Sequence, residues 1–310
     1  MNLNRFQIQV ATGRFTLPVV VIVCLLGWSI SLQEWSELAS LAITALIGYV
    51  MIEANTAFTL IRTRTSLPVS IYGWMATALF FLHPMEWSNL IPLIFILSVI
   101  QLFRSYESSS PTNPIYHTFL FIGLGSLIFP QIIYFVPLFW GSMIPFRAMS
   151  GRSFLASLLG IITPYWFLFG YAFLYDKMEL FWKPIQEMTH FYPMAYNHLT
   201  LPELISWGII TILLIISSIH YGYAAYMDKT RTRIYHSFVA FAGFWATLFS
   251  ILQPVHLQEL MPVQLICMAF LSGHLFSLTR NRFSGILFIV IFAAFILLMI
   301  FNLWMQYFNS

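Results

Sequence analysis

The chain has 310 residues, of which 59% are apolar and 8% are charged, and its mean hydropathy is +0.81. A water-soluble domain needs a more polar surface than this composition provides, so the surroundings of the chain are mostly lipid. The formal net charge of +3 is explained by an excess of arginine in cytoplasmic loops, and no nucleic-acid partner is expected. In hydrocarbon every backbone N–H and C=O group needs an internal partner, which leaves helices or a closed barrel.

The apolar runs decide between these two architectures. The first run, 15–31, and the last, 286–304, lack the alternation of barrel strands and have about the length of membrane-spanning helices. The sequence therefore predicts an all-α fold, a polytopic transmembrane helix bundle. Arg5 and Arg14 precede the first run as in a signal peptide, but no small-residue cleavage site follows it, so we interpret it as a retained span. The predicted spans are 15–31, 38–61, 67–83, 88–103, 115–129, 131–146, 153–174, 203–227, 235–251, 260–279 and 284–304.

The distribution of lysine and arginine orients these eleven spans. Basic residues favour cytoplasmic loops, because moving them across the membrane during insertion is costly. With the N-terminus in the cytoplasm and the C-terminus outside, Lys177 and Lys183 lie outside and the other twelve of the fourteen basic residues lie inside. Among the acids, Glu107 and Asp228 are predicted inside. The twelve inner basic residues are Arg5, Arg14, Arg62, Arg64, Arg104, Arg147, Arg152, Lys229, Arg231, Arg233, Arg280 and Arg282.

Two features of this topology stay open in the sequence. The spans 115–129 and 131–146 are each about 15 residues long, so they either cross the membrane twice or form a re-entrant hairpin, which would leave nine full spans. The longest connection, about 175–202, mixes aromatic and charged residues and is predicted to be an outer interfacial loop, which is either an amphipathic segment lying on the outer leaflet or a lid or catalytic loop for a lipid-linked substrate. Without a linker or a second soluble region, the chain is predicted to be a single transmembrane domain, 1–310.

The densest polar string of any predicted span is EANTAFTLIRTRTSLP, 53–68. If the helix continues through it, Glu53 and Arg64 share one stripe, and Asn55 and Arg62 share the opposite one. A carboxylate at the depth of Glu53 needs a partner or a proton, so one hypothesis is a binding site or proton relay open to the cytoplasm. The alternative is structural: an interhelical hydrogen bond, with both arginines reaching to lipid headgroups.

Histidines form a second group of candidates. His220 and His274 lie within predicted spans at a depth comparable to Glu53 and could line one cavity with it, although an intramembrane histidine often bonds a neighbouring helix. His236 looks interfacial. Neither the histidines nor Cys24 and Cys267 have the spacing of a metal motif, so no metal and no cofactor is predicted.

Small residues mark one expected helix contact. Gly123, Gly125 and Ser126 in FIGLGSLIF, and Gly160 in SLLGIITPYW, offer faces that allow two helix backbones to approach closely. We therefore predict tight packing at these positions.

Four strings in residues 50–175 stand out together: Asn55-x-x-Phe58-x-x-Ile61-Arg62-x-Arg64-Thr65-x-Leu67-Pro68, Leu102-Phe103-x-Ser105-Tyr106, GLGSLIFP at 123–130 and SLLGIITPYWFLFGY at 157–171. With these strings the chain resembles an uncharacterised polytopic membrane family of Bacteroidota. That family has no established activity, so the resemblance implies location in the inner membrane of a Gram-negative cell and no reaction.

A looser similarity links residues 121–166 to multi-spanning glycosyltransferases that use polyprenyl-phosphate sugars. The shared pattern is a glycine-rich span, a basic cytoplasmic turn and a proline-containing span. Those enzymes place an acidic residue in a long first outer loop, so the similarity implies a catalytic role for Glu34 or Glu37. Here that loop is short, about 32–37.

Three functions are compatible with the sequence. The first is an accessory or scaffold component of cell-envelope biogenesis in the bacterial inner membrane, whose partners are membrane lipid, polyprenyl phosphate or other membrane proteins. The second is a glycosyltransferase or polymerase acting on a polyprenyl-phosphate-linked sugar. The third is a transporter for a small solute or lipid, which would need a site near the membrane midplane.

Overall fold

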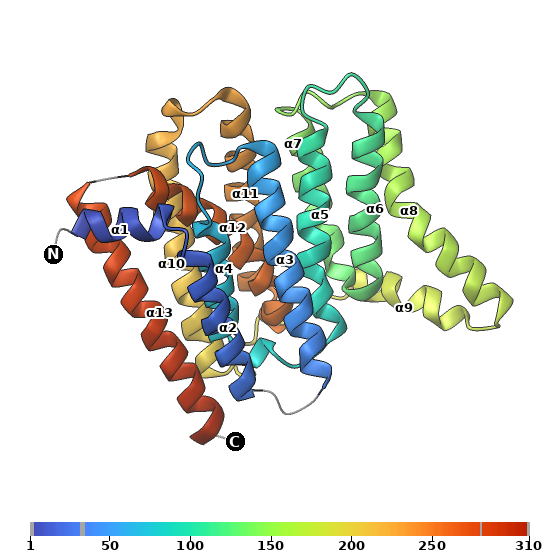
Figure 1. The fold of residues 1–310 in the computed structure, drawn as a ribbon. Helices are drawn as coiled ribbons and strands as arrows, with labels where there is room; N and C mark the ends of the chain where they lie inside the picture. Colours follow the sequence, from blue (N-terminus) through green and yellow to red (C-terminus); the bar gives the residue numbers. More distant parts are fainter. Residues whose placement is uncertain (1–2, 32–34, 280, 309–310) are drawn as a thin grey trace. The chain divides into compact units, whose positions relative to one another are not determined.

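The computed structural model describes residues 3–31, 35–279 and 281–308, which form helices joined by short turns (Figure 1). No strand occurs among these residues, so the predicted all-α fold is confirmed. The chain divides into two compact units. Unit 1 comprises Met1–Glu86 and Ala195–Ser310, and unit 2 comprises Trp87–Met194.

The described part of unit 1 contains eight α-helices in two separate stretches of sequence. Short 3-10 helices extend three of the connections: Phe80–Leu82 after α4, Ala225–Met227 after α10 and Pro254–His256 before α12. The helices are α1 (Leu3–Thr12), α2 (Thr16–Ser31), α3 (Ser36–Phe58), α4 (Leu67–Ala78), α10 (Leu201–Ala224), α11 (Thr230–Leu252), α12 (Leu257–Leu278) and α13 (Arg282–Phe308).

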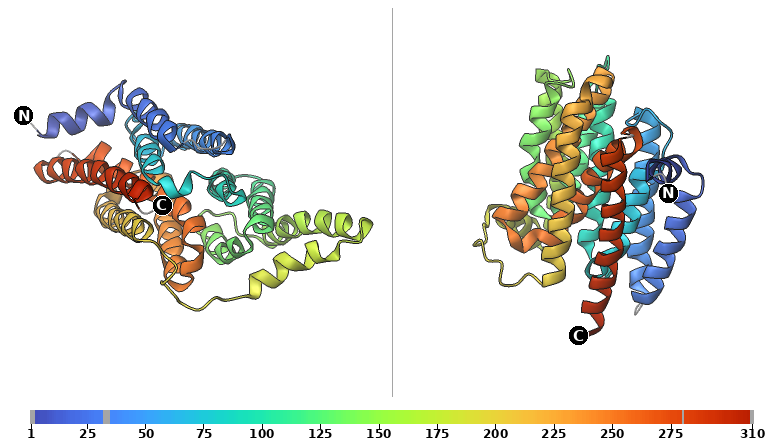
Figure 2. Two further views of the ribbon diagram at one scale, coloured as in Figure 1. Left: turned by 90° about the horizontal axis from the view of Figure 1, so that it is seen from below. Right: turned by 90° about the vertical axis from the view of Figure 1, so that its left-hand side faces the viewer.

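Helix α12 forms the centre of unit 1. In its most apolar window 94% of the residues are buried, against 56% or less in every other helix of spanning length among the described residues. Helices α4, α10 and α11 pack against it, and α1 lies beside the start of α13 (Figures 1 and 2). The buried Gln7 of α1 donates hydrogen bonds to the carbonyls of Phe276 and Thr279, both at 2.8 Å, which ties α1 to the end of α12.

Unit 2 is a smaller bundle around α6. Its elements are α5 (Ile91–Arg104), α6 (Thr112–Ile128), α7 (Val136–Met143), α8 (Gly151–Leu174) and α9 (Met178–Thr189), with 3-10 helices at Trp87–Leu90 and Pro130–Phe135. Helix α6 packs between α5 and α8, and α9 contacts the end of α8 (Figure 1). The α6–α8 contact is tight, because a Cβ added to Gly160 would lie 2.6 Å from the carbonyl oxygen of Tyr116. The predicted close packing at Gly123 and Gly160 is confirmed.

Each predicted span contains helix, but not all these helices have spanning length. Seven are long and apolar enough, and the α1–α2 pair, bent by 82° between Phe6–Thr12 and Thr16–Ile30, adds an eighth if it counts as one span. Such helices are those expected of a polytopic membrane protein. In the open region, α6 has 17 residues and α7 has 8. The count of eleven and the orientation stay predictions, as does the single-domain organisation.

Candidate functional site

The polar string 53–68 is helical only in its first part, which forms the end of α3, and at its last two residues, which begin α4. Helix α3 ends at Phe58, and Thr59 follows with a left-handed backbone conformation, φ 49°. The side-chain oxygen of Asn55 accepts a hydrogen bond from the backbone N–H of Ile61 at 3.2 Å, which stabilises the departing chain. The predicted stripes that joined Glu53 to Arg64 and Asn55 to Arg62 are therefore wrong, because neither arginine lies on α3.

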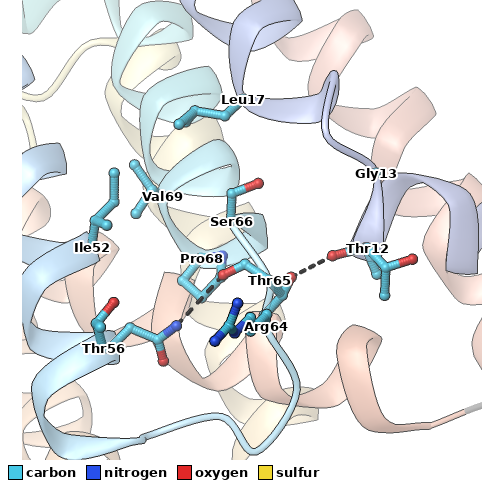
Figure 3. Close-up of a pocket in the computed structure, with 12 residues that line it drawn as sticks. Thr12, Gly13, Leu17, Ile52, Thr56, Arg64, Thr65, Ser66, Pro68 and Val69 are labelled. Atoms are coloured by element: carbon cyan, nitrogen blue, oxygen red, sulfur yellow. Dashed lines mark hydrogen bonds between the residues drawn. The ribbon is translucent and has the colours of Figure 1, made fainter.

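Arg64 lines a polar cavity of about 280 Å³, which we call the arginine pocket. The lining comes from the end of α1 and the turn after it, the start of α2, the last two turns of α3, the segment before α4 and the start of α4. Figure 3 shows Thr56, Arg64 and Thr65 at the polar side and Leu17, Ile52 and Val69 at the apolar side.

Two hydrogen bonds from side chains to backbone carbonyls shape this pocket. The Thr65 hydroxyl donates to the carbonyl of Ala11 at 2.5 Å, and the Asn55 amide lies 3.5 Å from the carbonyl of Thr65 (Figure 3). Arg64 itself is exposed and, within the described residues, its guanidinium forms no hydrogen bond or ion pair. The pocket therefore presents an unpaired positive charge held on a fixed loop.

An apolar groove continues from the arginine pocket between α2 and α3. Its volume is about 430 Å³, and it shares the lining residues Leu17, Ile52 and Val69 with the pocket. Helices α2 and α3 each pack on α4 and scarcely contact one another, so α4 forms the floor of the groove with Tyr72 and Gly73. Trp28 and Leu38 line its far part. We refer to this feature as the apolar groove.

Arg62 lines a different cavity of about 280 Å³, which we call the aspartate cavity. His220 and Tyr223 contribute from α10, Asp228 from the turn after it, and His274 from α12. His220 and His274 thus share one cavity, as the sequence suggested, and Arg62 lines the same cavity, which the sequence did not indicate. The remaining lining residues are Ala224, Tyr226, Met227, Leu278, Thr279 and Asn281.

A buried carboxylate–imidazole pair forms the inner wall of the aspartate cavity. The Asp228 Oδ2 and His274 Nε2 atoms lie 2.7 Å apart, and the two side chains are 4% and 1% exposed. The imidazole of His274 packs against the rings of Tyr221 and His236, with centroids 5.0 and 4.9 Å away. Burial and packing fix the orientation of the pair.

The other two histidines are also held by hydrogen bonds. His236 Nε2 donates to the carbonyl of Leu60 at 2.9 Å, and His220 Nε2 is bonded to the hydroxyl of Thr279 at 2.8 Å. The His236 side chain is fully buried between α10, α12 and the segment after α3, and its interfacial depth in a membrane stays a prediction.

The acidic candidates lie elsewhere. Glu53 is exposed on α3 and lines none of these three cavities, so it does not join His220 and His274. Glu37 is buried in the first turn of α3. Glu34 lies outside the described residues. The proposed catalytic role of Glu34 or Glu37 stays a prediction.

Asp228 is the residue of this site that sequence reasoning missed. It follows α10 in a segment otherwise rich in basic residues, where no motif distinguishes it. The sequence does contain one signal: Glu107 and Asp228 are the two acidic residues predicted in the cytoplasmic segments, where the other charged residues are basic. Both have nitrogen partners: the Glu107 carboxylate pairs with Arg147 at 2.7 Å.

Across the part of the chain that the structure describes, no group of three or more His, Cys, Asp or Glu side chains is arranged to hold a metal ion. Comparisons with protein-family models, with curated proteins and with solved structures found no match. The protein is thus classed by its helices and its cavities: a polytopic helical protein compatible with membrane integration, with two polar cavities in unit 1.

Proposed function

We propose that the protein is an accessory component of cell-envelope biogenesis in the bacterial inner membrane, and that it binds a phosphate-headed membrane amphiphile such as polyprenyl phosphate. The observation that carries this proposal is the continuity of the arginine pocket with the apolar groove, which share three lining residues. A polar pocket with a free cation that opens into an apolar channel matches the two chemical halves of such a molecule.

The headgroup half of the match depends on Arg64. A guanidinium recognises phosphate through parallel N–H donors, and Arg64 has no competing ion pair within the described residues. The hydroxyls of Thr56 and Ser66 line the same pocket and can donate neutral hydrogen bonds, whereas the Thr12 hydroxyl already donates to the carbonyl of Ile8 at 2.8 Å. A phosphate oxygen at this position would replace contacts that water otherwise makes.

The chain half of the match is the length of the groove. From Leu17 to Trp28 along α2 is eleven residues, or about 16 Å at 1.5 Å per residue. That is about half of a hydrocarbon core of about 30 Å, so the groove has the depth of one leaflet. Since Arg64 belongs to a predicted cytoplasmic loop, the bound amphiphile would lie in the cytoplasmic leaflet.

An accessory role fits these features better than transfer chemistry at the outer face. Of the two carboxylates suggested by the glycosyltransferase similarity, Glu37 is buried in the first turn of α3 and not presented to solvent. A lipid site in the cytoplasmic leaflet needs no outer catalytic carboxylate. The resemblance to the Bacteroidota membrane family supports the same inner-membrane location.

Native mass spectrometry of the full chain tests this proposal. The purified protein is mixed with polyprenyl phosphate and, separately, with phosphatidylcholine, and the retained lipid is measured. We expect Arg64→Gln to weaken retention of polyprenyl phosphate about tenfold, because a hydrogen bond to a charged group contributes about 1.5–3 kcal/mol. Ala45→Trp, which places a ring in the groove, should weaken it as well.

Arg152→Gln is the matched control, since Arg152 is an exposed arginine of unit 2 and lines neither feature. Equal retention of polyprenyl phosphate by wild type and Arg64→Gln would refute the headgroup assignment. Equal retention of phosphatidylcholine and polyprenyl phosphate by the wild type would show that the groove holds bulk lipid. A stoichiometric partner subunit in the same spectra would support the accessory role.

A further inference from the structure

The aspartate cavity is separate from the proposed lipid site and carries its own charges. Of its described lining residues, Arg62 and Asp228 bear formal charges at neutral pH, and the loop segment after α3 places Arg62 here while Arg64 faces the arginine pocket. The following inference therefore does not depend on the proposed function.

Only one of the two carboxylate oxygens of Asp228 accepts a hydrogen bond within the described residues. Its Oδ2 atom accepts from His274 at 2.7 Å, and its Oδ1 atom accepts no hydrogen bond within the described residues. A carboxylate can accept about four hydrogen bonds, and Oδ1 is not among the buried side-chain atoms without a partner, so it is reachable from the cavity. The open oxygen therefore calls for a donor inside the cavity.

His274 does not supply that donor, because its Nε2 atom is already bonded to Oδ2 of Asp228 at 2.7 Å. The Nδ1 atom of His274 is buried and without a hydrogen-bond partner, and the ring is packed between Tyr221 and His236. Its neutral form donates one hydrogen to Asp228 and leaves one negative charge on the pair. We regard His274 as a positioning residue that fixes the carboxylate.

Arg62 provides the opposite charge without neutralising Asp228. Its guanidinium is exposed and contacts the carbonyl of Met227 at 3.4 Å, and no ion pair joins it to Asp228 in the described part of the chain. A ligand with only a negative charge would be repelled by Asp228, and one with only a positive charge would be repelled by Arg62. A ligand that carries both charges satisfies both residues.

We propose that the aspartate cavity binds a short zwitterion, with its ammonium group on Asp228 and its oxyanion on Arg62. The ammonium donates to the open Oδ1 atom, and the oxyanion accepts from the guanidinium. Tyr223 and Tyr226 are 79% and 73% exposed at the rim and can cover an ammonium group with their ring faces. An aminoethyl phosphate group has this chemistry, either free or as the headgroup of phosphatidylethanolamine.

The first experiment compares a whole probe with its two halves. The full chain is placed in phosphatidylcholine nanodiscs, and binding of phosphoethanolamine, ethanolamine and inorganic phosphate is measured by calorimetry. We expect phosphoethanolamine to bind at least about tenfold more tightly than either half, because each half leaves one charge of the cavity unpaired. Half-probes that bind as tightly as the whole probe would overturn the proposal.

Variants then assign the two ends. Asp228→Asn should weaken phosphoethanolamine binding about tenfold while leaving phosphate binding equal or tighter, and Arg62→Gln should weaken both. Arg152→Gln, an exposed arginine of unit 2 that does not line the cavity, should bind like the wild type. Because Asp228→Asn can loosen the packing around His274, substitutions at the exposed Arg62, to glutamine or to the charge-keeping lysine, give an independent answer. Wild-type binding by Arg62→Gln would overturn the proposal.

Phosphatidylethanolamine nanodiscs distinguish the two sources of this chemistry. If the lipid headgroup is the natural occupant, free phosphoethanolamine should bind more weakly there than in phosphatidylcholine nanodiscs, because the headgroup competes. If a soluble compound is the occupant, the two nanodiscs should give the same affinity. Either result supports the zwitterion site, since both require binding to Asp228 and Arg62.

Discussion

Arg62 and Arg64 stand two residues apart, yet each lines a different cavity. This separation depends on the end of α3, because a helix that continued through them would have placed both on its own surface. Thr59 makes the break with φ 49°, and Asn55 caps it. At the scale of single residues, the two proposed sites thus rest on one turn.

A substitution at Thr59 tests this turn. A β-branched residue in the left-handed region costs about 1–2 kcal/mol, and glycine avoids that cost. We therefore expect Thr59→Gly to increase the free energy of unfolding by about 1 kcal/mol, which should raise the thermal unfolding midpoint in detergent. Thr59→Ala retains the Cβ atom and should gain clearly less. Equal shifts from glycine and alanine would contradict a strained left-handed residue.

The sequence identified the residues of these sites better than it predicted their arrangement in space. The polar string 53–68 stood out by composition, and Asn55, Arg62 and Arg64 all line or cap a described feature. The end of the helix at Phe58 was not predictable, because no glycine or proline marks it. The predicted helical stripes therefore included Arg62 and Arg64, which the structure places on a loop.

Helix α12 shows the same limit at the scale of secondary structure. Its apolar run predicted a span, but not that it would be the most buried helix of unit 1. Polar side chains hold its neighbours in place: the buried Gln264 amide donates to the hydroxyls of Thr211 on α10 and Thr247 on α11, at 2.9 and 2.8 Å. Such pairings between distant residues leave no periodic signal in one sequence.

Small residues were more informative than polar ones, and α8 offers a matched test of their packing. A Cβ at Gly160 would lie 2.6 Å from the Tyr116 carbonyl oxygen and 2.9 Å from the Leu120 nitrogen, whereas a Cβ at Gly170 would meet nothing within 4 Å. We expect Gly160→Ala to destabilise the protein by about 1–3 kcal/mol, as overpacking does, and to lower the thermal midpoint.

Gly170→Ala is the control on the same helix and should leave the midpoint unchanged or slightly higher. If the two alanine variants melted together, the close α6–α8 approach would be contradicted. A selective loss at Gly160 would instead support the tight packing that the small-residue pattern predicted.

For the whole molecule, hydropathy predicted where helices occur but not how many cross the membrane. All eleven predicted ranges contain helix, yet only seven helices, or eight with the bent α1–α2 pair, have spanning length among the described residues. Short helices such as α7, with 8 residues, arise where Pro130 and Pro137 interrupt an apolar run. The apolar composition of a segment indicates that it lies in lipid or in the protein core, whereas the positions of prolines determine how long its helix can be.

The charge distribution makes a separate prediction about orientation. Lys183 of α9 and Lys229 before α11 are both exposed, and the distribution of basic residues places the first outside and the second in the cytoplasm. In a Cys24→Ala, Cys267→Ala background, Lys183→Cys should react with a membrane-impermeant maleimide on intact spheroplasts. Lys229→Cys should react only after the membrane is opened, because its loop would have required several basic residues to cross. Reaction of both cysteines before opening would contradict the predicted topology and move both proposed sites from the cytoplasmic face.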